Sequence, residues 1–244
     1  MADILYIKGF RIDHHAPEYK DSYLSTITSL CHLYDFSFHR QVTFFVGENG
    51  TGKSTILEAL AVNAGFNPEG GSKNFNFATH NTHSNLYSAT RVIKGADYPK
   101  DGFFLRAESF YNLASNIDEI GDPIFLEQYG GKSLHEQSHG ESFLSLMLNR
   151  FRGNGLYILD EPEAALSPSK LMTMLVRINE LVHQNSQFII ATHSPMLMAY
   201  PDADIYLLSD DEVKKTCYED TEHYIVMRHF LENPQKMLHY LFHE

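Results

Sequence analysis

The sequence predicts an α/β domain built on a mostly parallel central sheet. Four short apolar runs have the length and composition of strands that are buried on both faces. They are residues 42–46, 156–159, 188–191 and 205–208. Helical segments at residues 54–64 and 169–182 alternate with these runs, as in chains that wind helices onto a parallel sheet. At 244 residues, with 43% of them hydrophobic, we expect residues 1–244 to form one domain.

The chain opens with elements that precede the central sheet. Residues 4–12 alternate in polarity and predict a first strand, and the apolar segment 24–33, flanked by polar turns, could be a helix. The strand at 42–46 and the helix at 54–64 follow, with Ile56, Leu57, Leu60 and Ala61 on one side of that helix. Residues 67–77 have no periodicity and predict a loop.

The middle of the chain predicts an antiparallel β subdomain and a small helical lobe. Two β-rich runs, residues 85–93 and 102–110, are joined by a turn near 97–101. The lobe covers residues 111–152. Its first part is polar and contains short helical pieces, and its last part is a helix over 141–151. Phe143, Met147 and Phe151 recur there at i, i+4 spacing, which is typical of a core-facing stripe.

Charge and composition exclude several classes of protein. The net charge of −12 lacks the basic footprint of a dedicated nucleic-acid binder, although a local basic groove for DNA stays open. No run approaches 18 apolar residues, so we expect no direct insertion into a membrane. Two cysteines, Cys31 and Cys217, form no disulfide framework, and no signal sequence opens the chain, so the expected location is cytoplasmic.

Residues 47–55 read GENGTGKST and fit the pattern G-x-x-x-x-G-K-[ST]. Such a turn directs backbone N–H groups at the α- and β-phosphates of a nucleotide, its lysine reaches the β- and γ-phosphates, and its hydroxyl binds Mg²⁺. The turn joins a predicted strand to a predicted helix, whose N-terminus then faces the anion. The predicted nucleotide-binding residues are Gly47, Glu48, Asn49, Gly50, Thr51, Gly52, Lys53, Ser54 and Thr55.

A second motif, LYILDEPEAALS, covers residues 156–167. The apolar run ends in Asp160 and Glu161, which would place two carboxylates at the C-terminal edge of a parallel sheet, where ligands of such folds bind. Asp160 is the candidate ligand of Mg²⁺, through water, and Ser54 is a second one. Glu161 points differently and suits the orientation or deprotonation of an attacking water.

Two further motifs are weaker. QSHGES, residues 137–142, puts Ser138 and Gly140 at a predicted helix N-terminus, which is either a second anion site or an ordinary N-cap. His193, in IIATHSP, follows a strand as a group contacting a γ-phosphate would, although a lone histidine is more often structural. Histidine pairs at 80 and 83, or at 135 and 139, lack a cysteine or carboxylate that would complete a metal site.

The ordered set GENGTGKST, QSHGE, LYILDEP and ATHS resembles the Walker A, signature, Walker B and switch-histidine motifs of ABC-type ATPase cassettes. In that family two cassettes face head to tail, and each ATP lies between one Walker A and the other subunit's signature. The resemblance therefore implies Mg²⁺ and ATP as cofactors, an ATP-dependent homodimer, and a D-loop at residues 164–167. It assigns catalytic roles to Lys53, Glu161 and His193, and ATP contacts in trans to Ser138, Gly140 and Glu141.

The departures from transport cassettes are informative. Their usual L-S-G-G-Q signature is replaced by a motif that ends in Glu141, as in the SMC, RecF and OLD-nuclease branch, and YIKGFR at residues 6–11 is similar to that branch's first strand. The interval from Lys53 to Ser138 is too short for an SMC coiled-coil arm, so the chain looks like a stand-alone head of a soluble, AAA-like ATPase. By analogy Glu108 is the candidate Q-loop residue near the metal, and Arg11 the candidate adenine contact.

The implied function is a P-loop ATPase that binds and hydrolyses Mg·ATP in a dimer as a conformational switch, with a nuclease or DNA-associated partner. Two alternatives remain. The chain could be the ATP-binding subunit of a transporter, in which case its partner is a permease. It could also be a non-hydrolytic ATP sensor, which steady-state phosphate release would distinguish from an enzyme.

Overall fold

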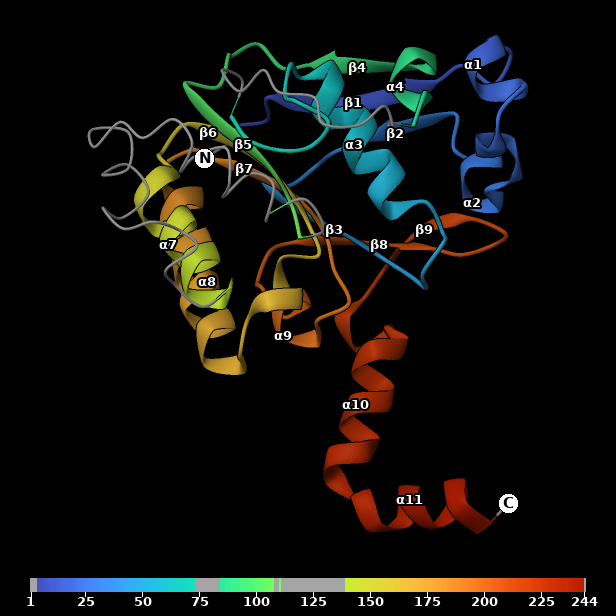
Figure 1. Cartoon of the computed structure of the whole chain (residues 1–244), viewed down its shortest axis with the longest axis vertical. Helices are drawn as coiled ribbons and strands as arrows, with labels where there is room; N and C mark the ends of the chain where they lie inside the picture. The colour runs from blue at the N-terminus through green and yellow to red at the C-terminus, as the bar shows by residue number, and fades with distance from the viewer. Residues whose placement is uncertain (1–3, 73–83, 108–109, 111–138, 244) are drawn as a thin grey trace.

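The computed structural model describes residues 4–72, 84–107, 110 and 139–243 (Figure 1). The helical lobe expected over residues 111–152 lies largely outside the described residues, and only its last helix can be compared with the prediction.

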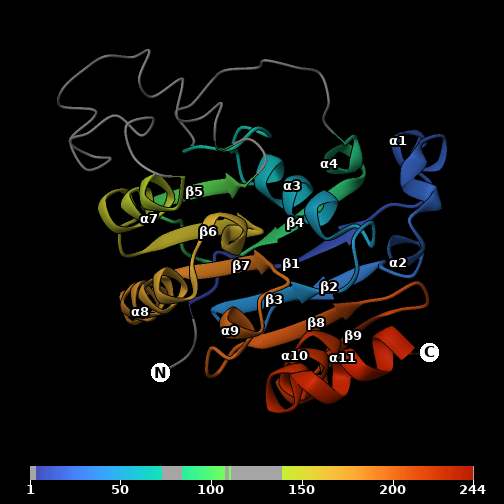
Figure 2. The same ribbon diagram turned by 60° about the horizontal axis from the view of Figure 1, so that its bottom comes forward.

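In this part of the chain a central sheet carries the strands in the order β5-β6-β7-β3-β8-β9 (Figure 2). They are β3 (Val42–Val46), β5 (Asp101–Arg106), β6 (Gly155–Asp160), β7 (Gln187–Ala191), β8 (Asp204–Leu208) and β9 (Val213–Thr216). All neighbours pair in parallel except β8 and β9, which are antiparallel. The predicted α/β fold with a mostly parallel sheet is confirmed, and β3, which leads into the P-loop, lies between β7 and β8.

Both faces of the sheet are buried. Along β3, Phe44 packs into one hydrophobic core and the neighbouring Phe45 packs into the other. The same alternation runs through β6, where Tyr157 and Ile158 belong to opposite cores. Because neither face meets water, the strands read as uninterrupted apolar runs, which is why the sequence locates them so well.

A second, antiparallel sheet has the order β2-β1-β4 and contains β1 (Ile7–Ile12), β2 (Asp35–Ser37) and β4 (Thr90–Lys94). The antiparallel subdomain is confirmed, but the direct connection of runs 85–93 and 102–110 within it is wrong. The first run begins as helix α4 (Leu86–Ala89) before β4, and the second forms β5 at the edge of the central sheet. Gln187 of β7 ties the sheets together, since its amide bonds the backbone of Tyr6 and Ile7.

Helices cover the two faces of the central sheet (Figures 1 and 2). Helix α3 (Lys53–Asn63) packs on the face that also carries the small sheet, and α7 (His139–Arg150), α8 (Pro168–His183) and α9 (Pro195–Met198) line the other. The helix expected over 24–33 is broken into a 3₁₀ turn, η1 (Tyr23–Thr26), and the short α2 (Thr28–Cys31). Ile27 is extended between them, and three consecutive β-branched residues explain this break.

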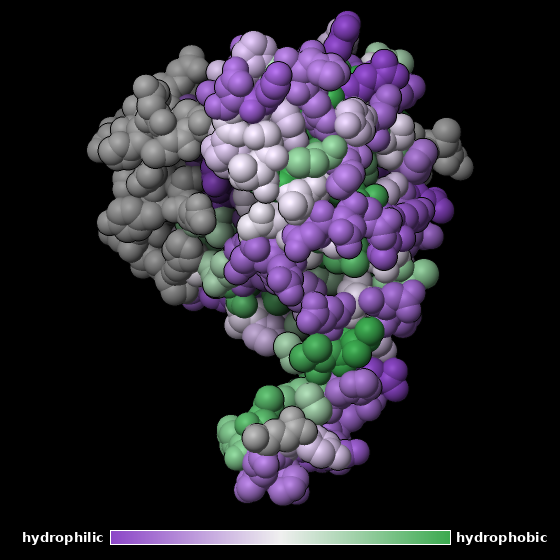
Figure 3. All heavy atoms as spheres, turned by 90° about the vertical axis from the view of Figure 1, so that its right-hand side faces the viewer, coloured by the Kyte–Doolittle hydropathy of each residue, from purple (hydrophilic) through white to green (hydrophobic). Residues whose placement is uncertain are grey.

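The C-terminal segment forms an arm that the sequence analysis did not predict. A short helical turn, η4 (Tyr218–Asp220), leads into α10 (Glu222–Glu232) and α11 (Pro234–His243), which project from the body (Figure 1). Neither helix contains a buried residue. Hydrophobic side chains are exposed along both helices, among them Ile225, Val226, Met227, Phe230, Leu231, Leu238, Leu241 and Phe242 (Figure 3).

Candidate functional site

The glycine-rich turn between β3 and α3 has the backbone that its sequence requires. Gly47, Gly50 and Gly52 have φ angles of 142°, 84° and 87°, a region that favours glycine. At Gly47 a Cβ atom would also lie 2.3 Å from the carbonyl oxygen of Leu208 in β8. The loop therefore folds tightly against the end of the neighbouring strand.

Lys53 closes this turn from within. Its Nζ atom donates to the carbonyl oxygens of Gly47 and Glu48, at 2.8 Å each. Thr51 reinforces the same turn, because its hydroxyl donates to the Glu48 carbonyl at 2.8 Å. Lys53 is only 4% exposed, so its ammonium charge is poorly screened by water.

Ser54 and Asp160 meet at the edge of the sheet, although they are far apart in sequence. The Ser54 hydroxyl donates to Oδ1 of Asp160 at 3.0 Å, and Asp160, the last residue of β6, is 6% exposed. Behind them, Nε of Arg106 lies 3.7 Å from Oδ2 of Asp160, and Nη1 of Arg106 lies 2.7 Å from Oε2 of Glu58. Asp160 is thus held between a hydroxyl in front and a guanidinium behind.

Glu161 follows with an unusual backbone. Its φ of 50° is in the left-handed region, which costs a non-glycine residue about 1–2 kcal/mol, and its amide donates to the Ala191 carbonyl of β7. Nε2 of His193 lies 3.5 Å from Oε1 of Glu161. The backbone amide of His193 donates to Oε1 of the half-buried Glu163, which fixes the segment after β7 beside the segment after β6.

Burial and charge shift the titration of this cluster in defined directions. Burial lowers the pKa of Lys53, and the carboxylates of Glu161, Asp160 and Glu163 oppose that shift. Burial also lowers the pKa of His193, with Lys53 acting in the same direction and Glu161 in the opposite one. The pKa of Glu163 is raised by burial. His193 is therefore favoured as a neutral ring at pH 7.

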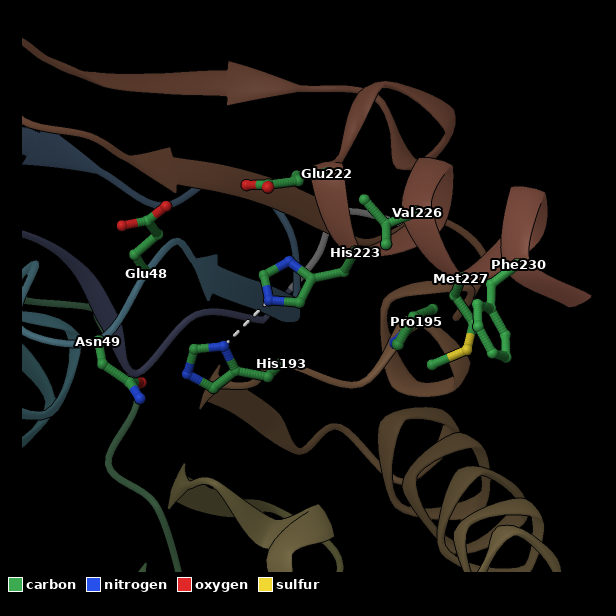
Figure 4. A pocket seen from close by; sticks show the side chains of 9 residues that line it. All are labelled: Glu48, Asn49, His193, Pro195, Glu222, His223, Val226, Met227 and Phe230. Atoms are coloured by element: carbon green, nitrogen blue, oxygen red, sulfur yellow. Dashed lines mark hydrogen bonds between the residues drawn. The ribbon is translucent and has the colours of Figure 1, made fainter. Parts of the chain in front are cut away.

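An open cavity of about 780 Å³ adjoins the turn (Figure 4). Glu48 and Asn49 of the P-loop, His193 and His223 line its polar end, and the other end is apolar. Pro195, Val226, Met227 and Phe230 form that apolar wall, three of them from α10. The arm thus contributes directly to the surroundings of the nucleotide turn.

The start of α7, which carries the signature-like motif, packs elsewhere. A Cβ atom on Gly140 would lie 2.3 Å from the carbonyl oxygen of Ala165, in the 3₁₀ turn η3 (Pro162–Ala165) that follows Glu161. Glu141, in the first turn of α7, is exposed. Ser138 lies outside the described residues, so its predicted role stays a prediction.

Three further residues predicted for the site are Arg11, Thr55 and Glu108. Arg11 lies in the small sheet and pairs with Asp35 at 2.9 Å, with no described contact to the P-loop. Thr55 is in α3, with no described side-chain hydrogen bond, and Glu108 lies outside the described residues.

Within the described ranges no group of three metal-binding side chains occurs, and no helix there is both long and apolar enough to cross a membrane.

Sequence reasoning missed four residues of the site: Glu58, Arg106, Glu163 and His223. Arg106 ends β5 beside Asp160, which ends β6, so the rule that functional groups gather at strand ends could have found it. Glu163 stands within the DEPE sequence that was already singled out. Glu58 and His223 carried no signal, because both occupy ordinary polar positions of helices.

Comparisons with known proteins agree with this geometry. An AAA-domain family matches residues 24–108, and an AAA-domain family described with the AbiEii toxin of type IV toxin–antitoxin systems matches residues 133–199. A curated relative from Haemophilus influenzae is described as an uncharacterized ABC transporter ATP-binding protein. It is 26% identical over 192 residues, which are 69% of this chain and 70% of the relative.

A solved structure described as an inward-facing conformation of a metal-chelate type ABC transporter has a TM-score of 0.44 at 15% identity and covers 80% of each chain. The two AAA-domain matches fall on the segments that carry the ordered motifs. Over these segments the chain is similar to the ABC-type, AAA-like P-loop ATPases.

Proposed function

We propose that this chain binds Mg·ATP and hydrolyses it to drive a conformational switch. The observation that carries the proposal is the 3.0 Å contact between the Ser54 hydroxyl and Asp160. This hydroxyl and this carboxylate meet beside the phosphate-binding turn and would hold Mg²⁺, Ser54 directly and Asp160 through water. The ion would supply charge neutralisation for the phosphates.

Lys53 would bind the β- and γ-phosphates. Its Nζ now contacts two carbonyls of the P-loop, which are neutral acceptors, and a phosphate oxygen is a stronger, charged acceptor. Backbone amides of the loop and the N-terminus of α3 add to the same attraction. The near-complete burial of Lys53 makes its charge effective at this point.

Glu161 would take the proton of the attacking water. As the water oxygen bonds to the γ-phosphorus, the bond to the β-phosphate oxygen breaks and ADP leaves. The two adjacent carboxylates have different neighbours, since Asp160 contacts Ser54 and Glu161 lies near His193. His193, 3.5 Å from Glu161, would contact the γ-phosphate beside that water.

The signature-like motif would act on a second chain. Helix α7 lies on the flank of the sheet opposite to α3 (Figures 1 and 2), and Gly140 at its start packs against Ala165 of η3. In a head-to-tail dimer, the phosphates of the ATP bound to the other subunit would lie at the N-terminus of α7. We accordingly propose that residues 111–152 form the lobe that carries the motif, and that Ser138, Gly140 and Glu141 face the ATP of the other subunit.

A second candidate is the ATP-binding subunit of a transporter. The description of the Haemophilus influenzae relative favours it, whereas the signature that ends in Glu141 favours a switch with a nuclease or DNA-associated partner. Affinity purification with and without ATP distinguishes them, because only the transporter reading expects a membrane-spanning permease to be captured.

The function is tested with Glu161→Gln. Loss of a general base costs about 10² to 10⁴ in rate, so this variant should bind ATP normally and release almost no phosphate. Glu180→Gln, which changes an exposed glutamate paired with Arg177, is the matched control and should hydrolyse normally. Normal turnover in Glu161→Gln would assign the base elsewhere, and a wild-type chain that binds ATP without turnover would be a sensor.

The dimer is tested by complementation. Ser138→Arg should bind ATP but not turn over, and Lys53→Ala should not bind it. A mixture of the two restores one composite site, so partial recovery of activity supports the head-to-tail arrangement. Activity per chain that is independent of dilution, together with normal hydrolysis by Ser138→Arg, would refute it.

A further inference from the structure

The base of the C-terminal arm meets the switch histidine. Thr221, 1% exposed, caps α10 by accepting from the amide of Tyr224, which fixes the first turn of the helix. In that turn, Nε2 of His223 lies 3.0 Å from Nδ1 of His193 (Figure 4). The two ring centroids are 5.1 Å apart and the ring planes are inclined by 57°. The rings therefore do not stack, and they meet through a hydrogen bond between ring nitrogens.

The two nitrogens of the His193 ring face different partners. Nδ1 faces His223, whereas Nε2 lies 3.5 Å from Oε1 of Glu161 and makes no hydrogen bond with any residue that the structure describes. A carboxylate only accepts, so a hydrogen on Nε2 gives an attraction there and a lone pair gives a repulsion. In a neutral ring with the hydrogen on Nε2, Nδ1 is an acceptor. The donor at the other end must then be Nε2 of His223.

We propose that His223 is a positioning residue of the nucleotide site: its Nε2–H donates to Nδ1 of His193 and holds that ring as the Nε2–H tautomer. The Nε2–H then points to Glu161, and with ATP bound it can donate to a γ-phosphate oxygen beside that carboxylate. This role rests on the proposed function of the site, but the tautomer itself does not require hydrolysis.

The neighbouring residues leave the orientation and tautomer of the His193 ring to be set by His223. Glu163 holds the backbone of His193, which leaves the side-chain rotation and tautomer to be set by another group. The charged groups that act on the pair are Lys53 and Glu161 on His193, and Glu222 and Lys53 on His223. Burial is the largest influence on both rings and favours their neutral forms, in which one donor and one acceptor can pair.

The direct test is the ring ¹⁵N spectrum of histidine-labelled protein, with His193 assigned by the loss of its signals in His193→Gln. The wild-type chain should show His193 as the Nε2–H tautomer. His223→Gln offers an amide donor and should keep it, whereas His223→Glu offers only an acceptor and should move the hydrogen to Nδ1 or protonate both nitrogens. An unchanged His193 spectrum in His223→Glu would overturn the proposal.

Turnover gives a second readout. His223→Ala should lower kcat about tenfold, as losses of outer-shell hydrogen-bond partners commonly do, with the KM for ATP changed less than about twofold. His223→Gln should recover most of this loss. His229→Ala, an exposed histidine of the same helix, is the matched control and should behave as wild type in both measurements.

The two proposals fail in different ways. A wild-type chain without ATPase activity that shows the expected tautomers contradicts the enzymatic function and leaves the role of His223 intact. Normal kcat in His223→Ala, with an active wild type and an unchanged His193 spectrum, removes the role of His223 and leaves the enzyme intact.

Discussion

Replacing Glu58 by alanine should destabilise the fold far more than its position in a helix suggests. Glu58 is 5% exposed, and its carboxylate accepts from Nη1 of Arg106 at 2.7 Å and from the amide of Ser84 at 2.8 Å. Arg106 in turn lies 3.7 Å from Asp160. The alanine variant therefore leaves a largely buried guanidinium and a buried amide without this acceptor.

The magnitude follows from burial. Removing one partner of a buried ion pair costs about 3–5 kcal/mol, and the 19% exposure of the Arg106 side chain places Glu58→Ala at the lower end, about 3–4 kcal/mol. For a chain of this size, each kcal/mol lowers the thermal midpoint by about 2–4 °C. We therefore expect a midpoint roughly 6–16 °C below wild type, measured by circular dichroism or scanning calorimetry.

Glu212→Ala is the matched control. Glu212 pairs with Lys214 at 2.8 Å, but both side chains are 52% exposed, and such a solvent-screened pair contributes little to the free energy of unfolding. Glu58→Gln should lie between the two, because the amide still accepts from Ser84 while the charge is lost. If Glu58→Ala melts within about 2 °C of Glu212→Ala, the Glu58–Arg106 pair is screened by solvent and this reasoning is refuted.

Three further predictions follow from the site and its surroundings. Lys53→Ala should abolish measurable ATP binding in calorimetry while the thermal midpoint stays near wild type, and unchanged affinity would exclude the P-loop as the phosphate site. Gly140→Ala places a methyl group 2.3 Å from the Ala165 carbonyl, so it should lower stability by about 1–3 kcal/mol, and a midpoint equal to wild type would contradict the close approach. Burial lowers the pKa of His14 below 6.5, so the unfolded chain binds this proton more tightly and stability should fall as the pH drops below about 6.5. Thermal midpoints at pH 5.5 and 7.5 measure this difference, which His14→Phe should reduce; an equal slope in that variant would exclude His14 as a source.

The sequence predicted four strands of the central sheet because burial on both faces leaves short, uninterrupted apolar runs. The run 42–46 coincides with β3, and the run 205–208 differs from β8 by one residue. The partition into two sheets was not predictable in the same way, since β4 and β5 are neighbours in sequence and their assignment to different sheets depends on long-range pairing. Helix α10, whose residues belong to neither described core, was not predicted.

The site residues also fall into two groups, those that lie in local sequence motifs and those that depend on long-range contacts. Its phosphate-binding turn and Asp160 follow from local motifs, whose spacing is set by the ligand. The ion pair between Glu58 and Arg106 and the contact between His193 and His223 join residues far apart in the chain. Each of these residue types is common on a helix or at a strand end, so only the tertiary structure distinguishes them from solvated side chains.

The exposed C-terminal arm should exist in an ordered and a locally unfolded state. Helices α10 and α11 have 11 and 10 residues and bury no side chain, and helices of this length are marginal without packing. Local opening of the arm should therefore require less free energy than global unfolding, and its amides should exchange hydrogen much faster than those of β3. If the first turn of α10 opens at about 1.4 kcal/mol, roughly one molecule in ten lacks the His223 contact at any moment. A ligand that favours the ordered arm would raise the occupancy of that contact without touching the P-loop.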